Sequence, residues 1–172
     1  MDEPRRCQWA SDKLLKQYHD DEYGKIITDD NKLFEKLSLE VFQAGLSWRT
    51  ILVKREYFRE VFFNFDINTV AALTDSYLES LLLDNRIIRN RKKIFATRQN
   101  AAALQKIILN CESFFKFVYG YGDPEKLSRA LREYGFTFMG ITIAESFMQS
   151  IGILPAHEQS CFLYRQTSAS ED

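Results

Sequence analysis

The chain has 172 residues, of which 45% are hydrophobic and 27% charged, so it can bury a sizeable core as a single globular domain. Its net charge of −1 at pH 7 excludes a global field that would draw it to nucleic acid or to a membrane surface, so any such attraction must be local. No apolar run is long enough to span a membrane, the N-terminus lacks a signal-peptide core, and three cysteines argue against a disulfide framework, which predicts a reduced, cytosolic setting.

The sequence reads as helix throughout, since only three prolines and seven glycines interrupt it. Apolar residues recur at helical spacing after residues that favour a helix start. Gly45 and Gly135 follow helix ends, where glycine is common. The expected helices start, in chain order, at Asp29-Asp30, Ser47, Asp66, Thr74-Asp75, about Asn90 (ending near Leu109), Phe114 (ending at Tyr119), Asp123-Pro124 and Thr142. No alternation typical of β-strands has a useful length, so the pattern predicts an all-α fold.

Both histidines and two of the three cysteines lie near the ends of the chain. His157 and Cys161 are four residues apart, a spacing that puts two side chains on one face of a helical turn and is common in metal sites. Cys7 and His19 would complete a Cys2His2 set, which suits zinc, and four protein ligands would make the site closed and structural. The alternative is a surface histidine and a buried free thiol. Cys111 has no partner at metal spacing and is assigned to the core.

The stretch LEVFQAGLSW, residues 39–48, is apolar almost throughout, yet it contains Glu40 and breaks at Gly45. On these residues alone, Glu40 is interpreted as a capped or paired glutamate that faces solvent. Trp48, like Tyr18, is interpreted as a core aromatic.

A short turn between residues 81 and 91 joins two expected helices and looks like a helix–hairpin–helix element. Turns of this kind direct backbone N–H groups and a helix N-terminus at phosphate. Between Asn85 and Cys111 the sequence has basic residues and no acidic one, which concentrates positive charge where a nucleic-acid backbone could bind. The basic residues are Arg86, Arg89, Arg91, Lys92, Lys93, Arg98 and Lys106. The alternative is an ordinary solvated helix face.

Several short runs, in order and over nearly the whole chain, resemble the DNA-3-methyladenine glycosylase I family. The most specific combination is QAGLSW at residues 43–48, IIRNR at residues 87–91, and the terminal cysteines and histidines. The other matching runs are RCQW (6–9), YHDDE (18–22), LFE (33–35), LE (39–40), KR (54–55) and SFMQ (146–149).

This resemblance implies an all-α, helix–hairpin–helix DNA glycosylase fold with a zinc site that joins the N- and C-terminal arms. It implies one compact unit over residues 1–172, with a helix–hairpin–helix lobe at about 30–112 and a zinc-containing lobe formed by 1–29 and 113–172. The implied activity is base-excision repair: the protein flips 3-methyladenine out of alkylated double-stranded DNA and hydrolyses its N-glycosidic bond, which releases the free base. We expect a monomer in the bacterial cytosol that does not bind membranes.

The resemblance also implies roles for individual residues. A structural zinc ion would be held by Cys7, His19, His157 and Cys161. Glu40 is the candidate catalytic residue, in a base pocket with Tyr18, Trp48, Trp9, Tyr23 and Gln43. Gly45 and Leu46 would form the wedge that enters the DNA stack, and contacts to the DNA backbone would come from Arg86, Arg89, Arg91 and Lys92.

Some positions depart from the family's pattern. Tyr23 stands where the family has Trp, a change that would alter the shape of the pocket. Arg86 stands at the hairpin glycine, so either the turn differs or Asn85 takes the left-handed backbone conformation. Glu145 replaces a usual Tyr, and Pro155-Ala156 a usual Asn-Asp. These departures leave an alternative function, a non-catalytic or altered-specificity, zinc-stabilised helix–hairpin–helix DNA-binding protein. A zinc hydrolase is disfavoured because four protein ligands leave no open metal position.

Overall fold

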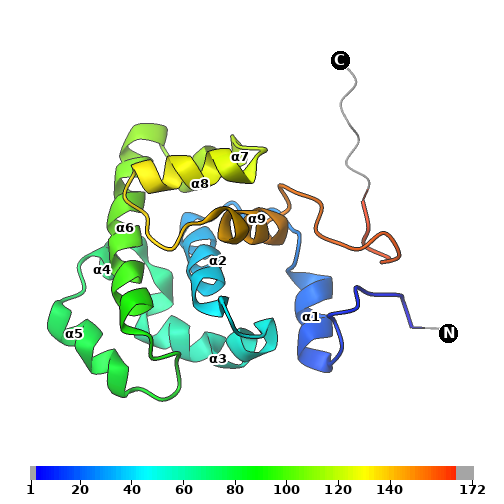
Figure 1. Ribbon diagram of the computed structural model, residues 1–172, viewed down its shortest axis with the longest axis horizontal. Coiled ribbons are helices and arrows are strands. Elements are labelled where there is room, and N and C mark those ends of the chain that lie inside the picture. Colours follow the sequence, from blue (N-terminus) through cyan, green and yellow to red (C-terminus); the bar gives the residue numbers. More distant parts are fainter. Residues whose placement is uncertain (1–2, 166–172) are drawn as a thin grey trace.

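The structure, a computed structural model, describes residues 3–165, and within that range it contains helices and no strand, which confirms the all-α class (Figure 1). The α-helices are α1 (Lys13–Asp21), α2 (Asp30–Gln43), α3 (Trp48–Val61), α4 (Ile67–Ala71), α5 (Asp75–Ser80), α6 (Arg91–Cys111), α7 (Phe114–Tyr119), α8 (Pro124–Glu133) and α9 (Ile141–Ser150). Two short 3₁₀ helices are η1 (Phe63–Phe65) and η2 (Leu81–Leu83). Over the described residues, no helix has the length and hydropathy of a membrane span.

Helix starts follow the caps that the sequence predicts. Each cap side chain accepts a hydrogen bond from the backbone N–H three residues on, a group with no partner inside its own helix. These caps are Asp29, Ser47, Asp66, Thr74 and Asp123. Asn90 caps α6 in the same way, and the helix continues to Cys111, beyond the predicted end. α9 starts at Ile141, one residue earlier than predicted.

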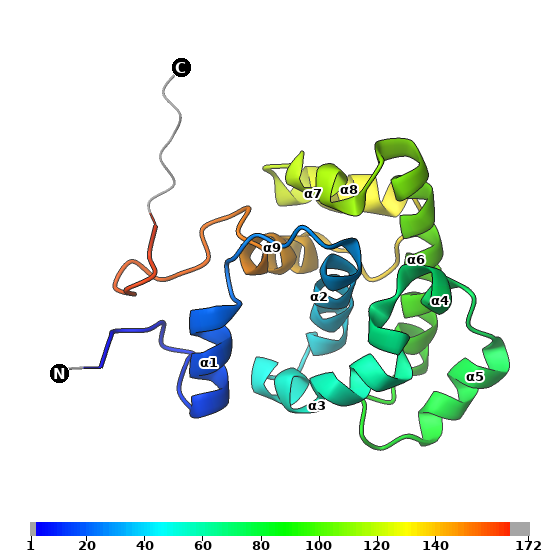
Figure 2. The same ribbon diagram turned by 180° about the vertical axis from the view of Figure 1, so that it is seen from behind.

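Helix α1 is the element that the sequence pattern did not predict. The segment has few apolar residues, and its buried face depends on Tyr18 and His19, whose side chains are polar. Asp12 caps it. Figures 1 and 2 place α1 at one end of the molecule, beside the segment that follows α9. There the N–H of Phe162 donates to the carbonyl of Arg5 over 2.8 Å, so the two ends of the described chain are joined.

Helix α2 lies at the centre of the fold. Its residues 33–42 are buried except for Glu35, because α3, α6, α7 and α9 all pack against it. Asp30 accepts hydrogen bonds from the N–H groups of Phe114 and Phe115, which ties the start of α2 to the start of α7. Polar residues on α2 are therefore carried into the interior. The division into two lobes near residue 112 stays a prediction.

Phe114 generates the first test, because its ring packs against those of Phe117, Phe136 and Phe147 with centroids 6.4 Å apart in each pair. Phe114→Ala should lower the free energy of unfolding by about 3–5 kcal/mol, since the smaller side chain packs less apolar surface and leaves a cavity. Chemical denaturation measures the change. Leu109→Ala is the control, because this exposed leucine on α6 should change stability by less than about 0.5 kcal/mol. Equal losses of stability in the two variants would contradict this view of the core.

Candidate functional site

A cavity of about 320 Å³ lies between α1, α2, the start of α3 and α9. Its volume is in the range of small-molecule sites. The structure brings all the predicted pocket residues to its wall: Trp9, Tyr18, Tyr23, Glu40, Gln43 and Trp48. The remaining lining residues are Leu15, Ser47, Arg49, Ser146 and Gln149.

Glu40 is the acidic group of this cavity, and its residue is only 6% exposed. Burial raises the pKa of its carboxyl to about 7, and the positive charge of Lys36 opposes that rise. Among the hydrogen bonds of residues 3–165, none engages this carboxylate. The interpretation of Glu40 as a solvent-facing, capped or paired glutamate was therefore wrong, because the packing around α2 excludes solvent. A buried carboxylate without a protein donor is an open acceptor for a ligand.

Aromatic rings form another part of the wall. Tyr18 contacts Trp48 at a centroid distance of 5.4 Å and Trp9 at 6.1 Å, and Tyr23 meets Trp9 edge-on at 5.0 Å. The buried Nε1–H of Trp48 has no acceptor among the described residues. An indole donor buried without an acceptor is energetically unfavourable.

The corner between α2 and α3 borders the cavity. Gly45 has φ +81°, a conformation that strains any L side chain. The Nε2–H of Gln43 donates to the carbonyl of Leu46 over 2.7 Å, and Ser47 then caps α3. Leu46 is 39% exposed and directly precedes Ser47, which lines the cavity.

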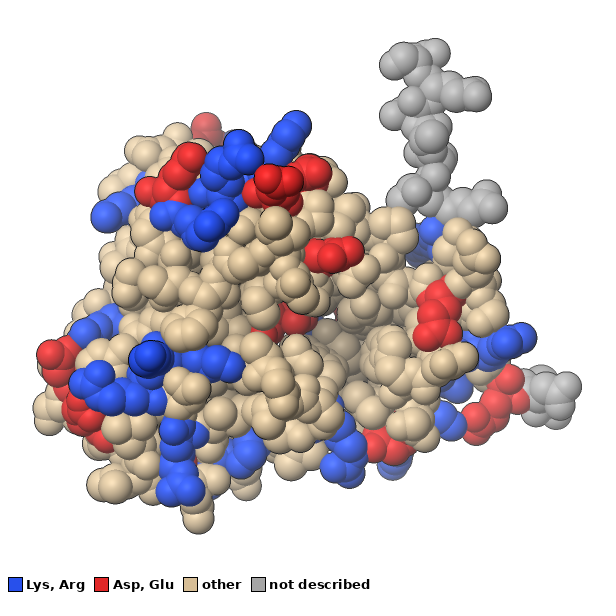
Figure 3. Space-filling model, in the orientation of Figure 1, with Lys and Arg blue, Asp and Glu red and all other residues tan. Residues whose placement is uncertain are grey.

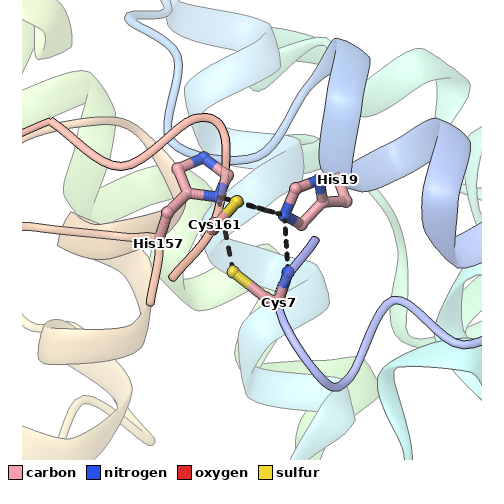
Figure 4. A group of neighbouring side chains, drawn as sticks. All are labelled: Cys7, His19, His157 and Cys161. Atoms are coloured by element: carbon pink, nitrogen blue, oxygen red, sulfur yellow. Dashed lines mark hydrogen bonds between the residues drawn. The ribbon is translucent and has the colours of Figure 1, made fainter. Parts of the chain in front are cut away.

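The predicted ligand set comes together at the junction of the chain ends, with its side chains directed at one another (Figure 4). The Nδ1 of His157 lies 3.6 Å from the Sγ of Cys7, 3.7 Å from the Sγ of Cys161 and 3.2 Å from the Nε2 of His19. The Nε2 of His19 lies 3.3 Å from the Sγ of Cys161. Ligands on a tetrahedral zinc ion, with bonds of about 2.3 Å to sulfur and about 2.0–2.1 Å to nitrogen, would be about 3.3–3.8 Å apart. The group can therefore hold a metal ion of that size.

Hydrogen bonds around the group orient its histidines. The Nδ1 of His19 lies 2.8 Å from an oxygen of Asp20, which Arg6 holds in turn. The Nε2 of His157 lies 3.3 Å from the carbonyl of Tyr23. Each outer nitrogen thus has an acceptor for its N–H, so the inner nitrogens carry no proton, as metal ligation requires. The inner Nε2 of His19 accepts from the N–H of Cys7 over 3.4 Å. Burial raises the pKa of the Cys7 thiol to about 11, so its thiolate needs a nearby cation to be stable.

His157 and Cys161 do not lie on a helix. The described segment after α9 consists of turns, and the N–H of Cys161 donates to the carbonyl of Glu158 over 2.8 Å. The prediction that one helical face aligns His157 and Cys161 was wrong, but the turn that contains them still brings both side chains into the Cys/His group. Pro155 near the start of the segment disfavours a helical continuation.

The turn between η2 and α6 is held by side chains. Positive φ angles occur elsewhere in the described chain, so neither Asn85 nor Arg86 takes the left-handed conformation considered above. Instead, the carboxylate of Asp84 accepts from the N–H of Arg86 over 2.9 Å. Lys54 donates to the carbonyls of Asn85 and Arg86 over 3.3 and 3.1 Å. The guanidinium of Arg86 pairs with Asp84 and Glu60, so much of its charge is already neutralised.

Lys and Arg side chains gather over the α5–α6 connection and the start of α6 (Figure 3). Residues 85–111 include no acidic residue, yet some of their basic side chains are paired, because carboxylates from earlier elements form ion pairs with them. Glu79 pairs with Arg91, and Asp75 with Arg98. Arg89 and Lys92 are exposed and take part in no ion pair with residues 3–165. These two are the predicted backbone contacts whose charge is most available.

Sequence reasoning missed Lys36. This lysine is only 7% exposed and lies one turn before Glu40 on α2, and its Nζ donates to the hydroxyl of Tyr18 over 3.0 Å. The spacing of four residues was the available signal, because it puts both side chains on one helix face. The cavity residues Arg49, Ser146 and Gln149 were not predicted either.

Comparison with known proteins gives a consistent result. Residues 8–126 and 122–164 match the methyladenine glycosylase family. The chain is 41% identical over 180 residues to DNA-3-methyladenine glycosylase 1 of Escherichia coli K12, covering 92% of this chain and 96% of that protein. A crystal structure of 3-methyladenine DNA glycosylase I superposes with a TM-score of 0.88 at 39% identity, covering 94% of this chain and all of the other. A variant of 3-methyladenine DNA glycosylase I in complex with 3-methyladenine also gives 0.88, at 30% identity and with 94% and 98% coverage.

Proposed function

The chain belongs to the methyladenine glycosylase family, and we propose that the cavity around Glu40 is its base-binding site. The protein is a DNA-3-methyladenine glycosylase of base-excision repair, which releases 3-methyladenine from alkylated DNA. The observation that carries the proposal for the site is the buried carboxylate of Glu40, which opens into an aromatic cavity without a hydrogen-bond donor from the described chain.

Recognition begins with extrusion, because a stacked base cannot reach a buried carboxylate. Flipping a nucleotide costs a few kcal/mol. In this proposal Leu46 enters the vacated space in the stack, as apolar wedges do in other proteins that bend DNA. The exposure of Leu46, which directly precedes the lining residue Ser47, and the positive φ of the turn at Gly45 support this role.

Charge then selects the damaged base. A 3-methylated adenine nucleotide is cationic, and unmodified adenine is neutral. The Glu40 carboxylate favours the cation and accepts hydrogen bonds from the base edge, while Tyr18, Trp9 and Trp48 offer aromatic faces to its ring. Protonation of Glu40 removes the anion, so recognition should weaken as the pH falls through about 7.

The reaction breaks the bond between the base nitrogen and C1′ of the sugar. The electron pair of that bond leaves with the base and cancels its positive charge, so the base departs neutral without prior protonation. The sugar gains oxocarbenium character, and water adds at C1′ while its proton passes to solvent. Glu40 is the candidate to orient or activate this water, in addition to binding the base.

We assign a structural zinc ion to Cys7, His19, His157 and Cys161, on the basis of their separations and of the outer hydrogen bonds to both histidines. When bound, zinc supplies a cross-link between the chain ends and no catalytic chemistry, since four protein ligands fill a tetrahedral site. Tyr18 directly precedes His19, and Trp9 lies two residues after Cys7, so the cross-link would also hold part of the proposed base pocket.

Glu40→Gln tests the base-binding role, because it keeps the shape of the side chain and removes its charge. Affinity for free 3-methyladenine should fall about tenfold, since a hydrogen bond to a charged group is stronger than a neutral one. Binding to a duplex with an abasic site should barely change. Leu46→Ala should show the reverse pattern, because it removes the wedge and leaves the pocket. Unaltered base affinity in Glu40→Gln would mean that this carboxylate is only structural.

The DNA-backbone role is tested with an Arg89→Ala, Lys92→Ala double variant. Removing each cation that binds a phosphate should reduce the slope of log affinity against log salt by about one, and binding should weaken equally on all sequences. Arg98→Ala is the matched control, because Asp75 already pairs with this arginine. A salt dependence equal to that of wild type in the double variant would place the DNA on another surface.

The zinc assignment predicts one equivalent of zinc per chain by elemental analysis. Cys161→Ala should lose the metal and lower the melting temperature, since the cross-link between the chain ends is gone. Cys111→Ala is the control, because this free, half-buried cysteine lies outside the ligand set. Metal-free protein whose stability does not respond to Cys161→Ala would refute the assignment.

A further inference from the structure

Lys36 is a buried cation that the mechanism above does not use. It lies outside the wall of the base cavity and lines a second cavity, of about 750 Å³, that adjoins it at Trp48. From there its Nζ reaches the Tyr18 hydroxyl at 3.0 Å and lies 4.5 Å from the centre of the Tyr18 ring. It also lies 5.9 Å from the Trp48 ring. The ammonium therefore supports two aromatic walls of the base cavity from behind.

Of the carboxylates near Lys36, only Glu40 has no arginine as a competing partner among the described residues. Three carboxylates act on it, and two of them are already paired with arginines of α3: Glu22 with Arg55, and Glu35 with Arg59. Glu40, the third, has no arginine partner among the described residues. It lies four residues after Lys36, on the same face of α2.

We propose that Lys36 is a positioning residue for base recognition, which holds the Tyr18 hydroxyl in place and keeps the Glu40 carboxylate ionised from behind the pocket wall. The inference rests on the proposed function of the cavity. Its physical basis is that both charges are buried on one helix face, where the interaction between charges is stronger than in water.

The balance of charges sets a pH range for this role. Burial lowers the pKa of Lys36 to about 8, against the pull of Glu22, Glu40 and Glu35, and Arg55 lowers it further. Burial raises the pKa of Glu40 to about 7, and Lys36 is the charge that lowers it. Both groups are thus ionised together between about pH 7 and 8. Without Lys36, burial of Glu40 is unopposed, so its carboxyl should ionise only at higher pH.

Lys36→Met tests the proposal, because methionine has a similar length and no charge. We would measure single-turnover release of 3-methyladenine from methylated DNA between pH 6 and 9.5, after subtracting spontaneous release. The acid limb of the profile should move up by about one unit, which corresponds to about tenfold slower release on that limb. The deficit should shrink above about pH 9, where wild-type Lys36 is itself neutral. Any part of the rate loss that does not change with pH would come from the missing hydrogen bond between Lys36 and the Tyr18 hydroxyl.

Three further variants separate this role from a purely structural one. Lys36→Arg keeps the charge and should keep the acid limb. Lys32→Met, an exposed lysine one turn earlier on α2, should match wild type. In a Glu40→Gln background, Lys36→Met should cause no further pH-dependent loss, because the group through which it acts is gone. Thermal melts identify any variant that fails to fold. If Lys36→Met does not fold, the acid limb of the pH profile of Lys36→Arg is still compared with that of wild type.

The outcomes distinguish the inference from the proposed function. Wild-type protein that releases no base at any pH would overturn the function of the cavity itself. If wild type is active and a folded Lys36→Met variant gives the same pH profile of base release, the role of Lys36 alone is overturned. An acid limb that moves in Lys36→Met but stays in Lys36→Arg would support it.

Discussion

The burial of α2 is the constraint on which the rest of this molecule depends. Helices α3, α6, α7 and α9 pack against it, so Lys36 and Glu40 on this helix are largely buried. Burial raises the pKa of Glu40 and lowers that of Lys36, and each charge opposes the shift of the other. The cavity therefore has a buried carboxylate and several aromatic rings in its wall, and the proposed recognition of a cationic base rests on these features.

The second constraint is the junction of the chain ends. The N-terminal segment that contains α1 and the turns after α9 have little apolar surface of their own. Together they supply Trp9, Tyr18 and Tyr23 to the cavity and all four side chains of the Cys/His group. Tyr23 belongs to both, because its carbonyl lies within hydrogen-bonding distance of His157 and its ring packs on Trp9. The shape of the cavity and the integrity of the junction therefore depend on some of the same residues.

The charged residues around the α5–α6 turn fall into two groups, those paired within the chain and those left unpaired by the described residues. Arg86 and Lys54 bind the turn internally, whereas Arg89 and Lys92 remain exposed and outside the ion pairs of the described chain. Asp84, Glu60 and Glu79 neutralise the arginines nearest to them. The near-neutral chain thus keeps a small local excess of positive charge, of the kind that can meet a phosphate backbone without a global field.

The sequence by itself determined the helical class, the caps at Ser47, Asp66, Thr74 and Asp123, and the membership of the Cys/His group, because these depend on local spacing and on residue chemistry. Only the tertiary structure decided which polar groups are buried and which charges are paired. From the sequence, Glu40 is expected to face solvent, but four helices pack against α2 in the structure. Arg86 is expected to be unpaired, but Glu60 and Asp84 form ion pairs with it. Lys36 acquires a partner only when α1 brings Tyr18 to it. Burial and ion pairing depend on contacts between segments that are distant in sequence, so the spacing of apolar residues along one segment does not reveal them.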